Sequence, residues 1–369
     1  MNKKKLKSIL IICPFPKNTA AGQRLKYEQY LNHWELMGFN IYISNFIDYS
    51  CWKITYKRGF LIKKIFGVLR GYLRRLKDIS RMKKYDIVYI HMWVTPYGST
   101  LFERVFTFLS KKVIFDLEDN LLIKNDFDKA AHPNPITSFL KNPKKQIFLI
   151  KNSDVVITSS PDLEKICKRL NKNNLSFYIT SSINTEKFIP RKDKENNEII
   201  IGWTGTFSSK KYLNIVEDVL QELAREFQFK FHVIGNFEYF LPNIDLIVSK
   251  WSIEDEVKQM QTIDIGIYPL PKDEFVDGKS GLKAIQYMAF GIPTVASNVG
   301  NTPNIISNNI DGILVNNKME WRLALRELIK NQKLREKMGN NARKKALENY
   351  SLGIVSKSYA KVINLCTEK

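Results

Sequence analysis

The sequence has few cysteines and no long apolar run, and each shortage excludes a class of protein. The four cysteines follow no metal-ligand spacing and no paired pattern, which excludes a disulfide scaffold and fits a reducing cytoplasm. No stretch reaches about 18 uncharged apolar residues, so no membrane-spanning helix is predicted. The apolar run 9–13 is too short for a signal peptide and no small-residue cleavage site follows it, so we interpret it as a buried strand.

Acidic residues are scarce in the first half of the chain. Residues 1–190 carry 33 Lys and Arg against 15 Asp and Glu, a net charge of +18, whereas the remainder carries only +3. A charge distribution this uneven indicates an anionic partner for the first half. An apolar content of 44% still supports a globular core, and 369 residues predict two or three domains.

Short buried strands alternate with helical segments along most of the chain. The apolar runs at 8–13, 86–90, 112–115 and 154–158 predict strands, and a second series begins at Ile199, after a charged linker at 191–198. This alternation predicts an α/β protein of two doubly wound Rossmann-like domains facing across a cleft, with ligands at the carboxyl ends of the strands. The predicted parts are residues 1–190, residues 191–350, and a C-terminal helix at 351–369 that packs back on the first domain.

A glycine-rich loop in the segment DGKSGLKAIQYMA, residues 277–289, lies between a predicted strand and a predicted helix. Gly278 and Gly281 allow the backbone to approach a ligand closely, and free N–H groups at the helix start form an anion site. Lys279 adds a positive charge beside Ser280, which suits a diphosphate, and Gln286 is placed to bond hydroxyl groups. The alternative is a tight strand–helix turn with a solvated lysine.

Two further glycine loops also connect a strand to a helix. In IGWTGTFSSKKYL, residues 201–213, Gly205 and Thr206 offer donors close to Lys211, and the alternative is an ordinary capped helix start. In PFPKNTAAGQR, residues 14–24, the loop predicts close approach of a ligand at Gly22, with two side chains pointing into the cleft, Gln23 and Arg24. A solvated loop is the alternative there.

Together these blocks resemble bacterial glycosyltransferases of the large retaining family four, which have the two-Rossmann GT-B architecture. The resemblance runs from about residue 14 to 350, through AAGQR, FDLEDNLL, IGWTGTFSSKKYL and a block of the form GK-x-G-x-K-x-x-QYMA. It implies that the second domain binds a nucleotide-diphosphate sugar through the 278–281 backbone. Gln286 takes the place of the second glutamate of an E-x7-E motif, and a glutamine can still bond the ribose.

Two positions depart from the pattern of the family. Gly278 stands where the first glutamate of the motif is expected, and Thr206 stands where a phosphate-binding arginine is common. The resemblance therefore implies that Asp277 or Glu274, in the same loop, substitutes for the glutamate, and that Lys279, Lys283 or Lys211 compensates for the arginine. With lysines and backbone N–H groups stabilising the leaving diphosphate, no metal and no other cofactor is expected.

The first domain offers acids where many relatives carry a histidine near the donor sugar. Asp116, Glu118 and Asp119 follow the strand VIF, and carboxylates there can accept the proton of an acceptor hydroxyl. A metal site and an N-capping cluster are the alternatives. His91, at the end of DIVYIH, is the other catalytic candidate, although a lone histidine at a strand end is more often structural.

Residues 57–84 contain eleven Lys and Arg, one acid, and apolar residues at helical spacing. A basic amphipathic helix is typical of a membrane-surface element, and the alternative is a helix whose apolar stripe packs on the first domain. Nucleic acid is disfavoured as the anionic partner because no nucleic-acid-binding pattern accompanies the charge.

The sequence thus predicts a peripheral glycosyltransferase on the cytoplasmic face of the bacterial membrane, acting in surface-polysaccharide synthesis on a saccharide or lipid-linked acceptor. Two rivals remain open. One is a nucleotide-sugar 2-epimerase with hydrolytic chemistry on the same fold, and the other is a non-catalytic sugar-binding or scaffold protein, suggested by the glycine at 278.

Overall fold

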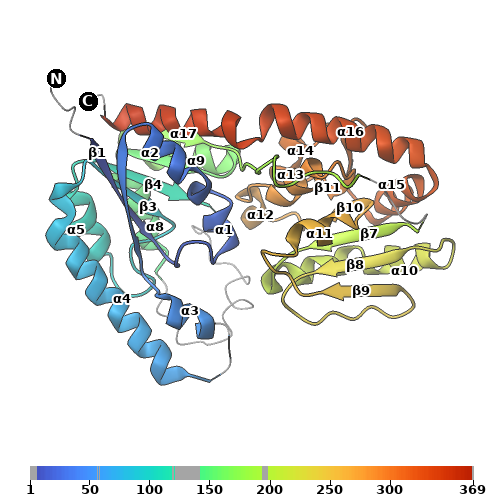
Figure 1. Cartoon of the computed structure of the whole chain (residues 1–369), viewed down its shortest axis with the longest axis horizontal. Coiled ribbons are helices and arrows are strands. Elements are labelled where there is room, and N and C mark those ends of the chain that lie inside the picture. Colours follow the sequence, from blue (N-terminus) through green and yellow to red (C-terminus); the bar gives the residue numbers. More distant parts are fainter. Residues whose placement is uncertain are drawn as a thin grey trace. The chain divides into compact units, whose positions relative to one another are not determined.

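A computed structural model describes residues 6–55, 57, 59–118, 120, 142–192 and 198–367 (Figure 1). The chain divides into two compact units: unit 1 comprises residues 1–180 and 355–369, and unit 2 comprises residues 181–354. The division thus falls after Thr180, ten residues before the predicted boundary, and the predicted linker at 191–198 lies only partly within the described residues. The C-terminal helix, expected at 351–369, is α17 (Leu352–Thr367).

Unit 1 is built on a six-stranded parallel sheet in the order β2-β1-β3-β4-β5-β6. The chain passes from β1 outward to β2 and returns to β3 on the other side of β1, so the topological switch point lies between β1 and β3. Ligands of such sheets bind beside the carboxyl ends of the strands at that point. The strands are β1 (Lys7–Cys13), β2 (Phe39–Asn45), β3 (Ile87–His91), β4 (Val113–Leu117), β5 (Val155–Thr158) and β6 (Ser176–Tyr178).

Helices cover both faces of this sheet because alternate strand residues point to opposite sides. On one face Tyr89 of β3 contacts Trp34, whose ring contacts Tyr359 of α17. On the other face the apolar residues of β1, β3, β4 and β5 form a core with those of α5, α8 and α9. The helices are α1 (Ala21–Arg24), η1 (Tyr27–Tyr30), α2 (Leu31–Leu36), α3 (Tyr49–Thr55), α4 (Leu61–Arg81), η2 (Met82–Lys84), α5 (Leu101–Leu109), α8 (Lys144–Asn152) and α9 (Pro161–Leu170).

Unit 2 repeats the doubly wound plan with the sheet order β12-β11-β10-β7-β8-β9, again parallel throughout. Its switch point lies between β7 and β10, where the chain returns to the other side of β7. The strands are β7 (Ile200–Thr204), β8 (Lys230–Ile234), β9 (Asp245–Ser249), β10 (Ile265–Tyr268), β11 (Thr294–Ser297) and β12 (Gly312–Val315).

The core of unit 2 forms between the sheet and the helices that follow its strands, with Trp203, Leu220 and Leu325 among the buried residues. These helices bury one apolar stripe each, as expected for helices that pack on a sheet. They are η3 (Phe207–Ile215), α10 (Glu217–Ala224), α11 (Glu256–Gln261), α12 (Glu274–Asp277), α13 (Leu282–Ala289), α14 (Thr302–Ile305), α15 (Lys318–Lys330) and α16 (Gln332–Asn349).

Candidate active site

The switch point of unit 2 is fastened by a buried tyrosine of α13. The hydroxyl of Tyr287 accepts a hydrogen bond from the N–H of Thr204 at 3.2 Å and lies 3.2 Å from the carbonyl oxygen of Gly202 and 3.4 Å from that of Ile267. It therefore connects β7 and β10 near their carboxyl ends and fixes α13 relative to both. Burial raises the pKa of Tyr287, so the hydroxyl stays protonated at neutral pH.

The loop at 278–281 connects α12 to α13 and lies at this switch point, as the sequence predicts. Gly281 has a φ of 72°, in the left-handed region, and a Cβ atom there would overlap the side chain of Ile305. A glycine is therefore required both by the backbone and by the packing. The carbonyl oxygen of Ser280 accepts a hydrogen bond from Asn301 Nδ2 at 3.2 Å, which holds the loop against the segment that follows β11.

The cations of this loop are half-buried and lie over aromatic rings. Lys279 Nζ is 4.7 Å from the ring centroid of Phe275, and Lys283 Nζ is 5.5 Å from that of Tyr268. Lys283 and Gln286 are three residues apart on α13, so they share the half-exposed face of a helix whose other face is buried in unit 2. Cations at the start of this helix favour an anion beside its free N–H groups.

The loop after β7 contributes less than the sequence suggests. The N–H of Thr206 donates to Ser209 Oγ at 3.1 Å, as in a capping box, so it is already used within the loop. Lys210 Nζ donates to the carbonyl oxygen of Glu238 at 2.6 Å, and Lys211 is exposed with its ammonium group 5.7 Å from the ring of Tyr212. Gly205 and Thr206 therefore lie at the switch point, but their loop serves mainly to cap the start of η3.

In unit 1, the carboxyl ends of β3 and β4 bring together His91, Asp116 and Glu118. Asp116 is fully buried; Lys26 Nζ lies 2.5 Å from its Oδ1, and the hydroxyl of Tyr89 donates to its Oδ2. Burial alone would raise the pKa of Asp116, but the Lys26 ammonium and then His91 lower the pKa to about 2. Asp116 is therefore an anion at neutral pH, as predicted for an acid at this strand end.

His91 lies between the two carboxylates and is fully buried. Its Nδ1 is 3.5 Å from Oδ2 of Asp116 and its Nε2 is 3.9 Å from Oε2 of Glu118. Within the described part of the chain, neither ring nitrogen has a hydrogen bond of good geometry. The side chain of Glu118 is 20% exposed, so it is the group of this trio that reaches solvent. Asp119, the third predicted acid, lies outside the described residues.

In the glycine loop after β1, Gly22 and Gln23 have roles that differ from the predicted ones. A Cβ atom on Gly22 would meet the Glu118 carboxylate, so this glycine makes room for Glu118. Gln23 was expected to point into a cleft, but it is buried: its Oε1 accepts from the N–H of Phe15 at 2.9 Å and its Nε2 donates to Glu28 at 2.9 Å. That prediction is wrong, because the amide is used to close the loop. Arg24 is half-buried at the end of α1.

Lys26 is the functional residue that the sequence reasoning missed. The only signal is a cation between the apolar neighbours Leu25 and Tyr27, in the segment 24–37, whose apolar spacing predicts one long helix. Instead the backbone of Lys26 leaves the helical region, with φ −115° and ψ −106°, and its side chain turns inward to Asp116.

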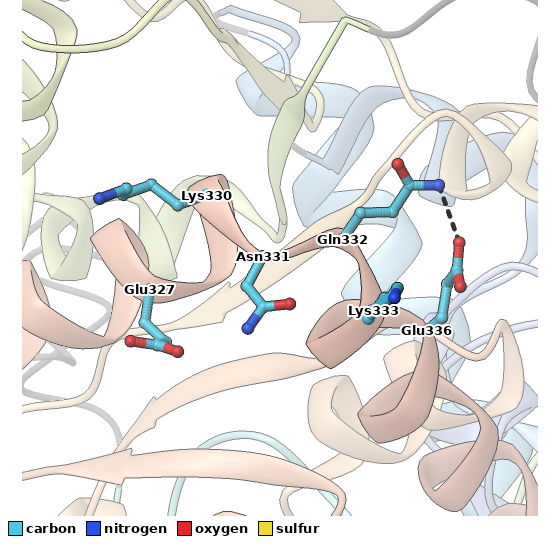
Figure 2. A pocket seen from close by; sticks show the side chains of 6 residues that line it. All are labelled: Glu327, Lys330, Asn331, Gln332, Lys333 and Glu336. Carbon is cyan, nitrogen blue, oxygen red and sulfur yellow. Dashed lines mark hydrogen bonds between the residues drawn. The ribbon is translucent and has the colours of Figure 1, made fainter.

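Two hollows on the surface of the described residues lie away from these groups. One of them, about 640 Å³, lies where α15 meets α16, and six exposed polar residues line it (Figure 2). Gln332 donates to Glu336 there at 2.8 Å, as Figure 2 shows. None of the predicted site residues lies in it, and no buried polar group faces it, so we assign it no function. Among the described residues, no group of three or more His, Cys, Asp or Glu is placed to hold a metal ion.

The basic helix expected at 57–84 is α4 with η2 (Figure 1). Most of its apolar stripe faces solvent. A hydrophobic helix face on a soluble unit ordinarily points to the core. Here seven residues of the stripe are 50–69% exposed: Leu61, Ile62, Ile65, Phe66, Leu69, Leu73 and Leu76. Tyr72 and Ile79, the other two residues of the predicted stripe, are half-buried and pack on unit 1. The alternative in which the stripe packs on the first domain therefore holds only for these two residues and is wrong for the rest.

The buried face of α4 is made of glycines and charges. Gly67 packs on Cys51 and Gly71 on Phe46, in spaces that a Cβ atom would overfill. Arg75 is fully buried; its guanidinium donates to the carbonyl oxygens of Cys13 at 3.0 Å and Val94 at 2.8 Å, and to Asp78 at 3.1 Å. Because Arg75 holds the helix to the strand ends, it is a structural cation rather than one of the surface cations that flank the stripe.

Two doubly wound parallel sheets, each with loops gathered at a switch point, have the GT-B architecture. Residues 184–345 match the family described as glycosyl transferases group 1, which supports the assignment of the protein as a glycosyltransferase. The capsular polysaccharide biosynthesis glycosyltransferase CapM of Staphylococcus aureus is 20% identical over 359 residues, covering 80% of this chain and 92% of CapM.

Solved structures show the same fold over almost the whole chain. Sucrose-phosphate synthase from Thermosynechococcus elongatus is similar with a TM-score of 0.70 at 14% identity, covering 98% of this chain and 99% of that chain. HepE from Anabaena, in complex with UDP-glucose, has a TM-score of 0.68 at 13% identity, covering 97% and 99%. At these identities the likeness establishes the fold alone. No helix in the described residues is long and apolar enough to cross a bilayer.

Proposed function

We propose that the protein transfers a sugar, with retention, from a nucleotide-diphosphate donor to a lipid-linked saccharide acceptor in bacterial surface-polysaccharide synthesis. The observation that carries this proposal is the loop at 278–281, held at the switch point of a glycosyl transferases group 1 domain with two half-buried lysines beside it. The relative named for capsular polysaccharide biosynthesis and the UDP-glucose complex of the structural neighbour support the same class of reaction.

On the donor side, Lys279 and Lys283 bind the diphosphate together with the free N–H groups at the start of α13. Negative charge gathers on the diphosphate as the glycosidic bond breaks, and fixed cations and N–H dipoles stabilise that charge without reorganising. Gln286, on the same face of α13 as Lys283, bonds the ribose hydroxyls. This arrangement supplies the stabilisation that a metal ion supplies in other transferases, so we expect no metal requirement.

On the acceptor side, Glu118 and His91 accept the proton of the attacking hydroxyl group. Glu118 reaches solvent and faces Nε2 of His91, whereas Asp116 is fully buried behind the imidazole. Asp116 is therefore a positioning residue, and its negative charge favours a proton on Nδ1 of His91. A general base at this position contributes about 10²–10⁴-fold to the rate in enzymes of known mechanism.

The exposed apolar stripe of α4 supports docking on an anionic membrane. Lys63, Arg70 and Lys77 recur every seven residues, so they form a row along one flank of the stripe. An exposed apolar face beside a row of cations fits the boundary between lipid headgroups and acyl chains. We therefore place the protein at the cytoplasmic surface of the membrane, where a lipid-linked acceptor resides.

Product analysis tests the proposal. The purified protein is incubated with a set of nucleotide-diphosphate sugars, with and without lipid-linked saccharide extracted from bacterial membranes. We expect nucleoside diphosphate release to depend on the acceptor and to match the sugar that appears on it. Release at the same rate without acceptor, together with a sugar epimerised at C2, would instead show the 2-epimerase chemistry.

A further inference from the structure

We propose that a groove between α3 and α4 binds one anionic phospholipid of the membrane on which the protein docks, with the lipid phosphate between Lys63 and Arg70. The groove has a volume of about 450 Å³ and is lined by Ser50, Cys51, Ile54, Lys63, Phe66 and Arg70. A volume of this size lies within the range of pockets that hold small ligands. The inference rests on the proposed membrane docking of the protein and specifies which lipid chemistry it recognises.

The lining of the groove divides into an apolar floor and a cationic edge. Cys51 is buried and Ile54 is half-buried, and both belong to α3, while Phe66 of α4 is exposed along the other wall. Lys63 and Arg70 are exposed and lie three residues before and four residues after Phe66, so both project on the same flank of the helix. An apolar floor below two cations matches an acyl chain below a phosphate.

The charges around the groove leave these cations available to an anion. Lys63 Nζ lies 5.7 Å from the ring centroid of Phe60, which is a weak contact. Arg70 lies 3.4 Å from Oδ2 of Asp48, the acid beside the groove, with both side chains partly exposed. The other oxygen of Asp48 accepts from the N–H of Cys51 and the hydroxyl of Ser50 and thereby caps α3. An exposed pair of this kind is weak, so a lipid phosphate can take its place.

Continuity with the exposed stripe of α4 identifies the occupant as a membrane lipid. Phe66 belongs both to the groove and to the stripe, so a chain lying on the groove floor extends directly into the apolar face that meets the bilayer. A free phosphate would leave this floor exposed to water, and a zwitterionic lipid would bring its own ammonium cation close to Lys63 and Arg70. One phospholipid with a net negative charge satisfies both.

The groove is also tied to the loop that makes room for the candidate catalytic glutamate. Trp52 of α3 packs on Phe15 with ring centroids 4.9 Å apart, and Phe15 makes two of the hydrogen bonds of the Gln23 amide. Gly22 of the same loop lies against Glu118. The helix that forms one wall of the groove therefore packs on the loop beside the acceptor-side groups.

Binding of a soluble short-chain lipid by the full chain tests this inference. A bimane fluorophore on Ser50→Cys reports entry of lipid into the groove, with dihexanoylphosphatidylglycerol as the probe below its micelle concentration. We expect saturable binding of this lipid and at least about tenfold weaker binding of dihexanoylphosphatidylcholine and of inorganic phosphate. The double variant Lys63→Gln/Arg70→Gln should weaken binding of the anionic lipid by about tenfold or more.

A charge-matched variant separates a specific groove from diffuse attraction. Lys83→Gln/Lys84→Gln removes the same charge from exposed positions of η2, beyond the other end of α4, and should leave the affinity within about twofold. Equal losses in the two double variants would overturn the inference, as would equal binding of inorganic phosphate. Tighter binding of a short prenyl phosphate than of the phosphatidylglycerol would also overturn it, by showing a site for the acceptor lipid.

Binding of a nucleoside diphosphate to the same samples keeps the two proposals apart. If the nucleotide binds and the lipid does not, only the proposed lipid site is contradicted. If the lipid binds and no nucleotide does, the lipid site is supported and the proposed glycosyl transfer is contradicted. A variant that fills the floor, Ile54→Trp, should abolish lipid binding and leave nucleotide binding unchanged.

Discussion

Lys26 Nζ lies 2.5 Å from Oδ1 of Asp116, and the two side chains are only 8% and 0% exposed. Asp116 also accepts from Tyr89 and faces His91, so one buried carboxylate joins η1, β3 and β4. Such a pair is costly to break because the remaining charge stays buried without compensation. The same ion pair therefore stabilises unit 1 and places a negative charge beside its candidate catalytic histidine.

Replacing Lys26 by Met should reduce the free energy of unfolding at pH 7 by about 3–5 kcal/mol, since it leaves Asp116 buried and unpaired. Urea unfolding followed by tryptophan fluorescence measures the change. Lys17→Met, at an exposed position of the same loop, should change the free energy of unfolding by no more than about 0.5 kcal/mol. The double variant Lys26→Met/Asp116→Leu should recover most of the loss; no recovery would show that Lys26 acts through something other than Asp116.

Unit 2 should lose stability in mild acid because of His232. Its ring nitrogens lie 2.9 Å from Thr262 Oγ1 and 2.8 Å from Ser249 Oγ, and burial lowers the pKa of His232 from 6.5 to about 4. Between these pH values the unfolded chain binds more protons than the folded one, so the free energy of unfolding falls as the pH falls, by up to about 3 kcal/mol.

This pH dependence is checked with unfolding curves measured from pH 7 to pH 4 for the wild type, His232→Asn and His33→Asn. The asparagine at 232 should flatten the pH dependence, whatever its effect at pH 7, while the exposed His33 should leave it unchanged. Equal slopes in the wild type and His232→Asn would contradict the assignment.

Most of the sheet could be predicted from the sequence, and the misses have physical reasons. Strands such as β3 and β5 are buried on both faces and contain continuous apolar runs. The edge strand β9 has no buried residue and only three consecutive apolar residues, and β6 has only three residues in all, so both give weak signals. One helix was predicted from Arg24 to Met37, but the chain breaks there into α1, η1 and α2 because Lys26 turns inward.

The sequence predicts only those parts of the candidate site whose signal lies in residues close together in the chain. Strand ends identified His91 and Asp116, and the glycine spacing identified the loop at 278–281. The contact of Lys26 with Asp116 joins residues 90 positions apart, which no local pattern specifies. The spacing of the apolar residues in α4 predicts the stripe but not whether it faces the core or solvent. Gly67 and Gly71 determine this, since only their side of the helix can approach the rest of unit 1 closely.

The exposed stripe of α4 makes a prediction that separates membrane docking from core packing. Ile65→Gln, Leu69→Gln and Leu73→Gln should each change the free energy of unfolding by no more than about 0.5 kcal/mol, because these side chains already face solvent. Combined, they should release the protein from anionic vesicles in a sedimentation assay. Losses of about 2 kcal/mol or more at each position would show that the stripe is core. The triple variant of exposed unit 2 residues Met319, Leu323 and Leu347 to Gln serves as the control.

Turnover should not depend on a divalent metal, because the diphosphate is stabilised by Lys279, Lys283 and helix N–H groups. We expect initial rates in excess EDTA to equal those with added magnesium or manganese. Loss of turnover in EDTA, restored by either ion, would contradict this and would direct the search for ligands to the acids between 116 and 128, some of which lie outside the described residues.

Calorimetric titration of a nucleoside diphosphate into the wild type and Lys279→Ala tests the central claim most directly. A charge-assisted contact with phosphate contributes about 1.5–3 kcal/mol, so the variant should bind about 10- to 100-fold more weakly while unfolding normally. Lys272→Ala, an exposed lysine shortly before α12, is the matched control and should bind like the wild type. Equal affinity in the wild type and Lys279→Ala, or no binding of any nucleoside diphosphate by the wild type, would contradict the assignment of the 278–281 loop as the donor site.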